Sequence, residues 1–376
     1  MAYLDHNATS PLRDEAKAAV SRALALCGNA SSIHAGGRAA RALIEEARAN
    51  VAALAGVGTT EVVFTAGGTE ANATALWGAV QGAADSGSRI TRLFVSAIEH
   101  GSVLANAAVL AERFAGLRLQ AIPVRKDSVA DLEALRDGLR EGKGKALVAL
   151  MAANNETGVI QPVTEAAELV REAGALLMVD AVQAAGKIAI PRADYVTLSA
   201  HKIGGPQGSG ALLLSEGVPF SPLLLGGGQE KGRRGGTENL SGIAGFGAAA
   251  SVAAPIPAGL RDGFETGLRQ IMPEAVIFAA GANRLPNTSN FALPGISAET
   301  ALMALDLDGV MLSSGSACSS GKVKPSHVLA AMGVSGDLAG CALRASFGWN
   351  SSEADVEAAL GSLSTLVARV RARQAA

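Results

Sequence analysis

The sequence predicts an α/β protein whose mainly parallel central sheet is covered by helices on both faces. Short runs of β-branched and aliphatic residues alternate with longer segments in which apolar residues recur at helical spacing. Of the 376 residues, 49% are hydrophobic and 18% are charged, so the chain can bury a large core and form two or three structural units. We therefore expect repeated strand–helix units followed by a second domain.

The predicted helices are alanine-rich or carry one apolar face. In the helix predicted at Arg38–Leu54, Leu43, Ile44, Ala47 and Val51 share a face, as is typical of a helix that packs on a core. The other helices of this part are predicted at Asp14–Ala25, Gly67–Val80, Ser102–Phe114, Asp131–Arg140 and Thr164–Gly174. The buried strands are predicted at Glu61–Thr65, Arg92–Ala97, Leu117–Ile122, Ala146–Met151, Ala175–Val179 and Tyr195–Leu198.

The sequence becomes rich in glycine after Lys202, and the proline-containing segment Ala253–Ala258 is the expected domain boundary. We expect residues 13–254 to form a large domain, and residues 1–12 and 255–376 to form a small one. In the small domain we predict helices at Leu260–Ile271, Ala298–Leu305 and Asp355–Val370, and strands at Ala275–Phe278 and Ser289–Ala292.

The composition argues against several classes of partner. The 32 basic and 34 acidic residues give a net charge of −2, which does not suit nucleic acid or an anionic membrane surface. The first residues lack the basic start and apolar core of a signal peptide, and glycines and prolines interrupt the longest uncharged run, Asn239–Leu260. The three cysteines form no CxxC motif and indicate no disulfide framework. We expect a soluble, cytoplasmic protein that binds neither nucleic acid nor membrane.

The stretch from Leu176 to Lys202 places two reactive groups at the ends of buried strands. Asp180 ends the first strand, and Lys202 follows the second. In a parallel sheet both side chains can point into the crevice beyond the strands, where such sheets bind ligands. Pyridoxal phosphate (PLP) needs an amine for its Schiff base and an acid against its pyridinium nitrogen, and Gln183 could reach the same ring. In the alternative interpretation, Asp180 caps a short helix and Lys202 is a solvated loop lysine.

The segment Gly67-Gly68-Thr69 lies between a predicted strand and a predicted helix. Free backbone N–H groups at the positive end of a helix suit a phosphate, although the segment matches neither the Walker loop nor the GxGxxG pattern. On its own, it fits a tight turn with Thr69 as the helix N-cap better than a phosphate site. A phosphate-bearing cofactor whose ring lies near Asp180 reverses that preference.

His100 follows a strand on the same expected edge of the sheet. An imidazole there can stack on a pyridine ring and move protons, or it can be a structural residue at a strand end. Arg344 likewise has two interpretations, a buried ion-pair partner or a bidentate clamp for a substrate carboxylate. No histidine pair has HxxxH or HExxH spacing, so we expect no metal site.

Cys318 lies in SSGSACSSG, a segment of small residues with little to pack. We expect a mobile backbone and an accessible thiol there, which suits a nucleophile that travels between sites. Cys27 and Cys341 have apolar or helical neighbours and are interpreted as packing residues.

From end to end, the chain resembles the cysteine desulfurases, which belong to the class-V aminotransferase family of PLP enzymes. The resemblance is strongest to the subgroup that serves nitrogen fixation and iron–sulfur assembly, and the length of sequence between Cys318 and Arg344 supports that subgroup. The matching segments are YLDHNAT, GNASSIH, GGTEAN, Glu99-His100, NNETG, VDAVQ, SAHK, RRGGTEN, SSGSACSSG and LRASFG.

The resemblance implies the PLP-dependent transferase fold of type I (aspartate aminotransferase-like), with a large domain and a smaller α+β domain that carries the mobile Cys loop at about 313–325. It also implies that Lys202 carries PLP and that Asp180 pairs with the ring nitrogen. Thr237 of the RRGGTEN block is expected to reach the phosphate bound by the partner subunit, so the active unit is a homodimer. The other expected cofactor ligands are His100 over the ring, Gln183 and Asn155 near the ring hydroxyl, and Gly68, Thr69, Ser199 and His201 at the phosphate.

The activity that the resemblance implies is removal of sulfur from L-cysteine, which gives L-alanine and a persulfide on Cys318. Arg344 and Asn155 are expected to bind the substrate, and His100 is the candidate for taking a proton from its thiol. The persulfide sulfur is expected to pass to an iron–sulfur scaffold or another sulfur-acceptor protein. A selenocysteine lyase or another class-V aminotransferase would share Lys202 but would not need Cys318. A non-catalytic sulfur-relay scaffold is the third possibility, and the intact set of reactive residues argues against it.

Overall fold

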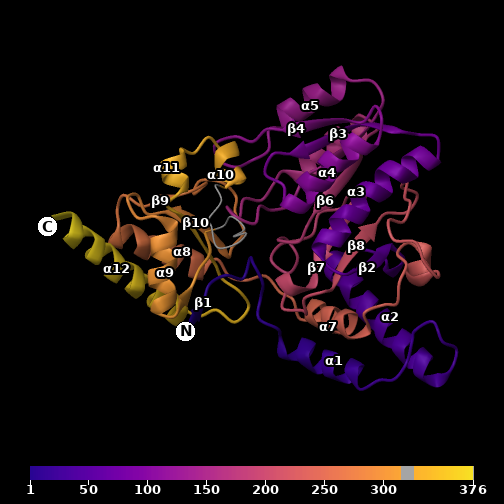
Figure 1. Cartoon of the computed structure of the whole chain (residues 1–376), viewed down its shortest axis with the longest axis horizontal. Helices are drawn as coiled ribbons and strands as arrows, with labels where there is room; N and C mark the ends of the chain where they lie inside the picture. The colour runs from indigo at the N-terminus through magenta and orange to yellow at the C-terminus, as the bar shows by residue number, and fades with distance from the viewer. Residues whose placement is uncertain (315–325, 376) are drawn as a thin grey trace.

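The computed structural model describes residues 1–314 and 326–375, and its main element is a seven-stranded sheet with the order β2-β8-β7-β6-β5-β3-β4 (Figure 1). Strands β4, β3, β5, β6 and β7 run parallel, whereas β8 is antiparallel to both β7 and β2. The predicted α/β class with a mainly parallel sheet is confirmed. The strands are β2 Val62–Thr65, β3 Ile90–Ser96, β4 Arg118–Ile122, β5 Lys145–Ala149, β6 Leu176–Asp180, β7 Tyr195–Ser199 and β8 Gly210–Leu214.

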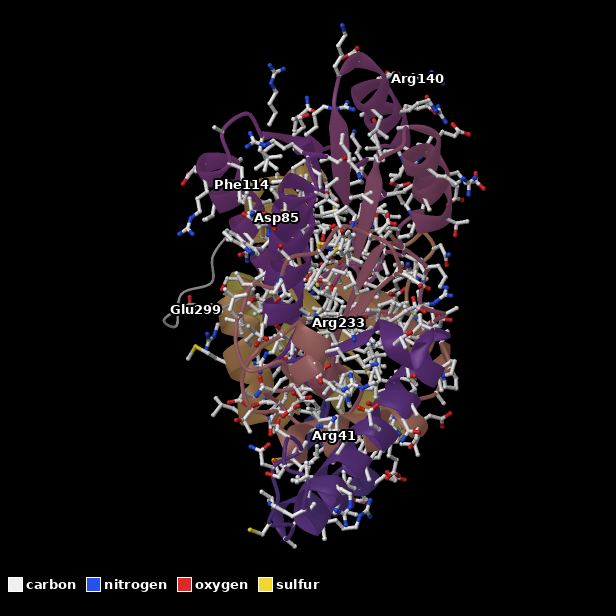
Figure 2. All side chains as sticks on the ribbon, turned by 90° about the vertical axis from the view of Figure 1, so that its right-hand side faces the viewer. Arg41, Asp85, Phe114, Arg140, Arg233 and Glu299 are labelled. Atoms are coloured by element: carbon white, nitrogen blue, oxygen red, sulfur yellow. The ribbon has the colours of Figure 1, made fainter. Side chains whose placement is uncertain are left out.

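Helices cover both faces of this sheet, because successive residues of each strand point to opposite faces. In β3, Leu93 and Val95 join the apolar cluster beneath α3 and α4, whereas Phe94 joins the cluster on the other face, beneath α2, α5, α6 and α7. Seen from the side of this sheet (Figure 2), Arg41 and Arg140 lie at opposite ends of the molecule, and both are exposed. The helices are α1 Asp14–Leu24, α2 Ala35–Ala55, α3 Gly68–Asp85, α4 Gly101–Arg113, α5 Leu132–Glu141, α6 Val163–Glu172 and α7 Leu240–Ser251.

The C-terminal part of the chain forms a second lobe, which the first strand of the chain joins (Figure 1). Phe264, Phe291 and Phe347 pack together in its core, with ring centroids 5.3 and 6.0 Å apart. The domain limits given above stay a prediction. The elements of the lobe are β1 Ala2–Tyr3, α8 Gly259–Ile271, β9 Val276–Ile277, β10 Thr288–Ala292, α9 Ala298–Leu307, β11 Val310–Met311, α10 His327–Ala331, α11 Gly336–Ala339, β12 Ala342–Ser346 and α12 Glu353–Ala375.

Several elements were not expected from the sequence, among them β8, β12, α7, α10 and α11. Helix α7 contains three glycines, which are poor helix formers, but its packing against α2 requires one of them. A Cβ atom at Gly247 would lie 2.4 Å from Ala47 Cα, so only glycine allows the two helices to approach this closely. Tertiary packing therefore overrides the weak helix propensity of this segment.

A buried ion pair joins α2 to the loop that follows β8. The side chains of Arg48 and Glu230 are almost fully buried, and the two hydrogen bonds between them measure 2.8 and 2.9 Å. The carboxylate also accepts the Phe64 N–H of β2 at 3.0 Å, and the guanidinium donates to Val62 O at 2.9 Å. Each buried charge thus has an opposite charge and further hydrogen bonds, the condition under which a buried pair is tolerated.

Replacing Glu230 with alanine is expected to lower the free energy of unfolding by about 3–5 kcal/mol, because the buried Arg48 charge loses its bidentate partner. Glu45 also contacts Arg48, at 3.2 Å, but its side chain is 50% exposed. We therefore expect Glu45→Ala to cost less than about 1 kcal/mol. Chemical denaturation of both variants measures the difference, and equal losses would contradict this account.

Candidate active site

A cavity of about 970 Å³ lies where β6 and β7 end, and residues from both lobes line it. It brings together ten of the twelve site residues predicted from the sequence. Of the other two, Thr237 is exposed and does not line the cavity, and Cys318 lies outside the described residues. The ten lining residues are Gly68, Thr69, His100, Asn155, Asp180, Gln183, Ser199, His201, Lys202 and Arg344.

Lys202 reaches the cavity from a short 3-10 turn, Ala200–Lys202, directly after β7. Its Nζ atom donates to the backbone oxygens of Asn7 and Ala8 at 2.6 and 2.7 Å, so the N-terminal segment crosses the site. Burial and the nearby Arg344 charge lower the pKa of Lys202 to about 8, although Asp5 and Asp180 act in the opposite direction. The amine is therefore far closer to its neutral, nucleophilic form at neutral pH than an ordinary lysine is.

Asp180, the last residue of β6, presents a buried carboxylate to the cavity. Its Oδ1 accepts the Val182 N–H at 3.0 Å, and its Oδ2 accepts the Asn72 amide at 2.8 Å. Residues 182–187 form turns, so the short helix of the capping interpretation is not present. Asn72 is held in turn by the Thr197 hydroxyl, which donates to its Oδ1 at 2.6 Å. Among the described residues no cation pairs with this carboxylate, so the site can accept a cationic group from a ligand.

The N-terminus of α3 forms one wall of the cavity. Gly67 is the N-cap of this helix, with φ +154°, and no side chain caps it, so the alternative role of Thr69 as the N-cap is wrong. Gly68 and Thr69 are the first two helical residues, and the cavity is also lined here by Ser199 and His201. The unpaired backbone N–H groups and the hydroxyls of this wall suit an anion. Burial and the Lys202 charge lower the pKa of His201 to about 4, so its imidazole is neutral at neutral pH.

His100 is the N-cap of α4, and the orientation of its ring is fixed by one backbone contact. Its Nδ1 accepts the Ser102 N–H at 3.2 Å and lies 2.7 Å from the Ser102 hydroxyl. A neutral imidazole that accepts a hydrogen bond at Nδ1 carries its proton on Nε2. Burial lowers the pKa of His100, so the neutral ring predominates at neutral pH. His100 thus has a structural role as a helix cap, and its role over a cofactor ring stays a prediction. The same contact leaves an N–H group on the other ring nitrogen of this cavity-lining residue.

Arg344, in the middle of β12, forms an ion pair in this structure. Its Nη2 lies 2.6 Å from Asp5 Oδ1, and its Nη1 donates to the backbone oxygen of Asn155 at 3.0 Å. Its Nε is buried without a hydrogen-bond partner among the described residues. The ion-pair interpretation is thus correct for this conformation, and the role as a clamp for a carboxylate stays a prediction.

Several residues at or behind the cavity were missed in the sequence. Asn72, which holds Asp180, is one, and His327, whose Nε2–H donates to the Glu99 carbonyl at 3.0 Å, is another. Glu99 is 1% exposed, and burial together with the Asp180 charge raises its pKa well above the usual range. Glu99 lies directly before His100 and just after a predicted strand, and this position could have identified it as a residue near the site.

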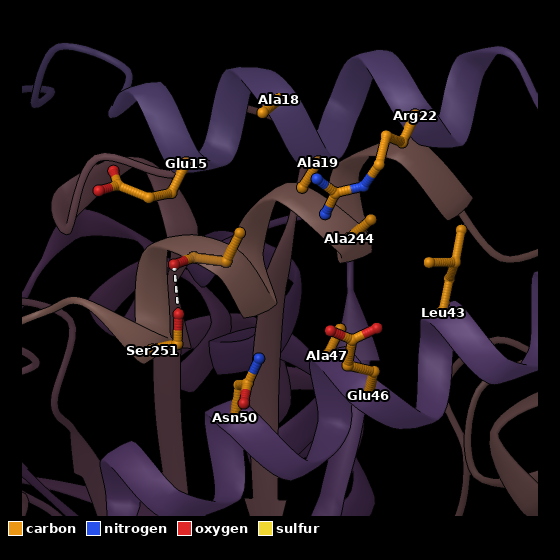
Figure 3. Close-up of a pocket in the computed structure, with 11 residues that line it drawn as sticks. Glu15, Ala18, Ala19, Arg22, Leu43, Glu46, Ala47, Asn50, Ala244 and Ser251 are labelled. Atoms are coloured by element: carbon orange, nitrogen blue, oxygen red, sulfur yellow. Dashed lines mark hydrogen bonds between the residues drawn. The ribbon is translucent and has the colours of Figure 1, made fainter.

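A second hollow, of about 340 Å³, lies between α1, α2 and α7 (Figure 3). Alanines form much of its wall, and Arg22 of α1 extends over it on the side opposite Glu46 of α2. None of the site residues predicted from the sequence lines it. It therefore plays no part in the arrangement around Lys202.

Outside the cavity, the described residues bear on three further expectations, about the cysteines, metal binding and membrane spans. Cys27 is exposed, so its interpretation as a packing residue is wrong, whereas Cys341 is half-buried against an apolar cluster. In residues 1–314 and 326–375, no group of three or more His, Cys, Asp or Glu side chains is placed to hold a metal ion. No helix in the same residues has both the length and the apolar character needed to cross a membrane.

Over nearly its whole length, the chain is similar to proteins of known families. The model of the family Aminotransferase class-V matches residues 2–359. A cysteine desulfurase of Cereibacter sphaeroides is 44% identical, over 98% of this chain and 96% of the relative, and an IscS-like cysteine desulfurase of Mycobacterium tuberculosis is 39% identical, over 99% and 97%. Among solved structures, the NifS-like protein from Rickettsia africae ESF-5 has a TM-score of 0.86 and 32% identity, covering 96% of this chain and 98% of that one.

Proposed function

Because the chain belongs to the aminotransferase class-V family, we propose that it is a cysteine desulfurase that uses PLP to release L-alanine from L-cysteine and holds the sulfur as a persulfide on Cys318. The observation that carries the proposal is the convergence of Lys202, Asp180 and Arg344 on one cavity. Relatives at 36–44% identity over nearly the full length bear the name cysteine desulfurase, which supports the same activity.

The residues of the cavity fit PLP on three counts. Lys202 supplies an amine with a lowered pKa, and Asp180 supplies a buried carboxylate that pairs with no cation among the described residues. The α3 N-terminus at Gly68 and Thr69 supplies free N–H groups for the phosphate. Bound there, PLP would supply an electron-accepting pyridinium ring, which stabilises negative charge on the substrate carbon. Asp180 would keep a proton on the ring nitrogen, and Asn72 would keep Asp180 in place.

Of the remaining side chains, one would bind the substrate and two would transfer protons. Arg344 would bind the substrate carboxylate with its guanidinium, exchanging its contact with Asp5 for one with the substrate. Lys202, once its amine is free, is the base whose pKa of about 8 suits proton transfer near neutral pH. His100 presents Nε2–H, so in this tautomer it gives a proton; the expected role of taking the thiol proton requires the ring proton to leave Nε2 first.

Sulfur transfer is assigned to Cys318 from the sequence and from the residues at either end of its segment. Ser314 and Ser326, the described residues on either side of 315–325, both line the cavity. In the proposed step the Cys318 thiolate forms a sulfur–sulfur bond with the substrate thiol sulfur as the carbon–sulfur bond breaks. The electron pair of the broken bond stays on carbon, which takes up a proton and becomes the methyl group of alanine. The products are L-alanine and the Cys318 persulfide.

We further propose that the active unit is a homodimer and that the persulfide passes to an iron–sulfur scaffold or another acceptor protein. Thr237 is exposed and lies outside the cavity of its own chain, which leaves it available to a neighbouring subunit. The block that carries it is tied to α3 by an ion pair between Arg234 and Glu70 of 2.8 Å, close to Gly68 and Thr69. The relatives named IscS support an acceptor in iron–sulfur cluster assembly.

The purified protein reconstituted with PLP tests the proposed function directly. Incubation with L-cysteine is expected to yield L-alanine in step with sulfur that a thiol reductant releases as sulfide. L-selenocysteine serves as the comparison substrate, because a selenocysteine lyase would turn it over and leave L-cysteine unchanged. Transamination of L-cysteine without sulfur release would indicate another class-V aminotransferase activity.

Attachment of PLP to the ligand-free protein is expected to depend on pH with a midpoint near 8. Only the neutral amine attacks the aldehyde of PLP, and the pKa of Lys202 is lowered to about 8 by burial and by Arg344. The rate should rise roughly tenfold per pH unit below the midpoint and level off above it. Stopped-flow absorbance measures the rate. Arg344→Ala should move the midpoint upward, and a wild-type midpoint near the ordinary lysine pKa of about 10.4 would contradict the assignment.

A further inference from the structure

A second lysine, Lys187, lies directly behind the cavity. It is 5% exposed, and among the described residues it forms no ion pair. Burial, followed by the charge of Lys202, lowers the pKa of Lys187 to about 7. Its Nζ donates to the backbone oxygen of Gln183 at 3.1 Å and to the side-chain Oε1 of the same residue at 3.3 Å. Both hydrogen bonds of this buried amine therefore go to one residue of the cavity.

Gln183 connects Lys187 to the reactive lysine. Its Nε2 donates to the backbone oxygen of Asn7 at 3.0 Å, and the same oxygen accepts Lys202 Nζ at 2.6 Å. Gln183 is 4% exposed and lines the cavity. One hydrogen of its NH₂ group is bound to Asn7, so the second is available to an acceptor in the cavity.

The chemistry of the ammonium group selects one of the two orientations of this amide. Below its pKa of about 7, Lys187 is an ammonium with three donors and no acceptor, so the atom of Gln183 that faces it is Oε1. When the amine is neutral, the Asn7 carbonyl, which can only accept, still favours the same orientation. The reversed amide would set its NH₂ group against the Lys187 donors and its oxygen against the Asn7 carbonyl. Each of these contacts would leave a buried polar group without a partner, which is costly in a protein interior.

We propose that Lys187 is a positioning residue, which holds the Gln183 amide with its NH₂ group toward an acceptor oxygen of the bound cofactor. The proposal rests on the proposed function, since it assumes that PLP occupies the cavity. Lys187 touches neither the cofactor nor the substrate and acts through Gln183 alone. A merely structural role would show in folding stability, whereas a positioning role shows in cofactor affinity.

Lys187→Met separates the two roles, because methionine keeps much of the side-chain length and removes the donors together with the buried charge. The melting temperature of the PLP-free variant is expected to be unchanged or higher, because an unpaired buried charge has been removed. The dissociation constant for PLP is expected to rise roughly tenfold, the effect of losing one hydrogen bond. Lys145→Met, a half-buried lysine at the start of β5, is the matched control and should leave the constant within about twofold.

A double variant shows whether Lys187 acts through Gln183. We expect Gln183→Ala to weaken PLP binding about tenfold and Lys187→Met to add less than about twofold to that loss, because the positioned group is already absent. Losses that multiply to about a hundredfold would overturn the proposal, as would a Lys187→Met variant with a lower melting temperature and wild-type affinity. If Lys187→Met does not fold, Lys187→Gln takes its place, since a neutral amide no longer selects one orientation. Failure of the wild type to bind PLP would instead overturn the proposed function.

Discussion

Replacing Lys202 with alanine is expected to lower the rate of alanine formation from L-cysteine by about a thousandfold or more, because one residue supplies both the attachment point for PLP and the base beside it. The amine lies at the end of β7, with its pKa lowered to about 8 and its Nζ 2.6 Å from Asn7 O. The measurement combines the activity assay with reduction by sodium borohydride, followed by mass spectrometry of the labelled peptide. The wild type should carry PLP on Lys202, and the variant should carry none after dialysis.

Two controls make the Lys202 result specific. Lys126→Ala, an exposed lysine on another part of the surface, should keep both the label and the activity. Lys187 is the other buried lysine near the site, and its Nζ faces Gln183. Borohydride labelling of Lys187 in the Lys202→Ala variant, with activity retained, would show that the wrong lysine has been assigned.

Strand ends were the most predictable part of the fold and of the site. A short run of aliphatic residues followed by a polar residue defines both the strand and the point where it reaches the sheet edge, so Asp180 and Lys202 could be placed together from sequence alone. The place of Gly68 at the start of a helix was predictable for the same reason, because a strand, a glycine turn and a helix follow each other locally. The positions of these strand ends and helix starts can be predicted from neighbouring residues alone, without distant contacts.

The partners of the site residues were not predictable, because they come from distant parts of the chain. The carbonyl groups of Asn7 and Ala8 accept from Lys202, and Asp5 pairs with Arg344. Nothing in the sequence near either partner indicates these contacts, which depend on how the N-terminal strand joins the second lobe. The roles of Asn72 and Lys187 were missed for a related reason. A single polar residue in a helix or turn becomes informative only when the group that it holds is known.

Exchanging Cys318 for serine is expected to leave PLP binding unchanged while alanine formation falls by about a hundredfold or more. Lys202, Asp180 and Arg344 remain, so the variant should still take up PLP to the wild-type level and change its absorbance when L-cysteine is added. A serine hydroxyl is scarcely ionised near neutral pH, whereas a thiol with the ordinary pKa of about 8.5 supplies a thiolate that attacks sulfur. The reaction should therefore stall after substrate binding and before sulfur transfer.

Mass spectrometry of the digested protein distinguishes this stall from other losses of activity. After a brief exposure to L-cysteine the wild type should gain the mass of one sulfur atom on the peptide that contains Cys318, and the serine variant should gain none. Cys27→Ser is the matched control, because Cys27 is exposed and does not line the cavity, and this variant should form the persulfide at the wild-type rate. A Cys318→Ser protein that makes alanine at the wild-type rate would show that sulfur leaves by another route. The sulfur would then leave at the sulfane level, as elemental sulfur or on a free thiol in solution, and the protein would act as a lyase without a persulfide on its own chain.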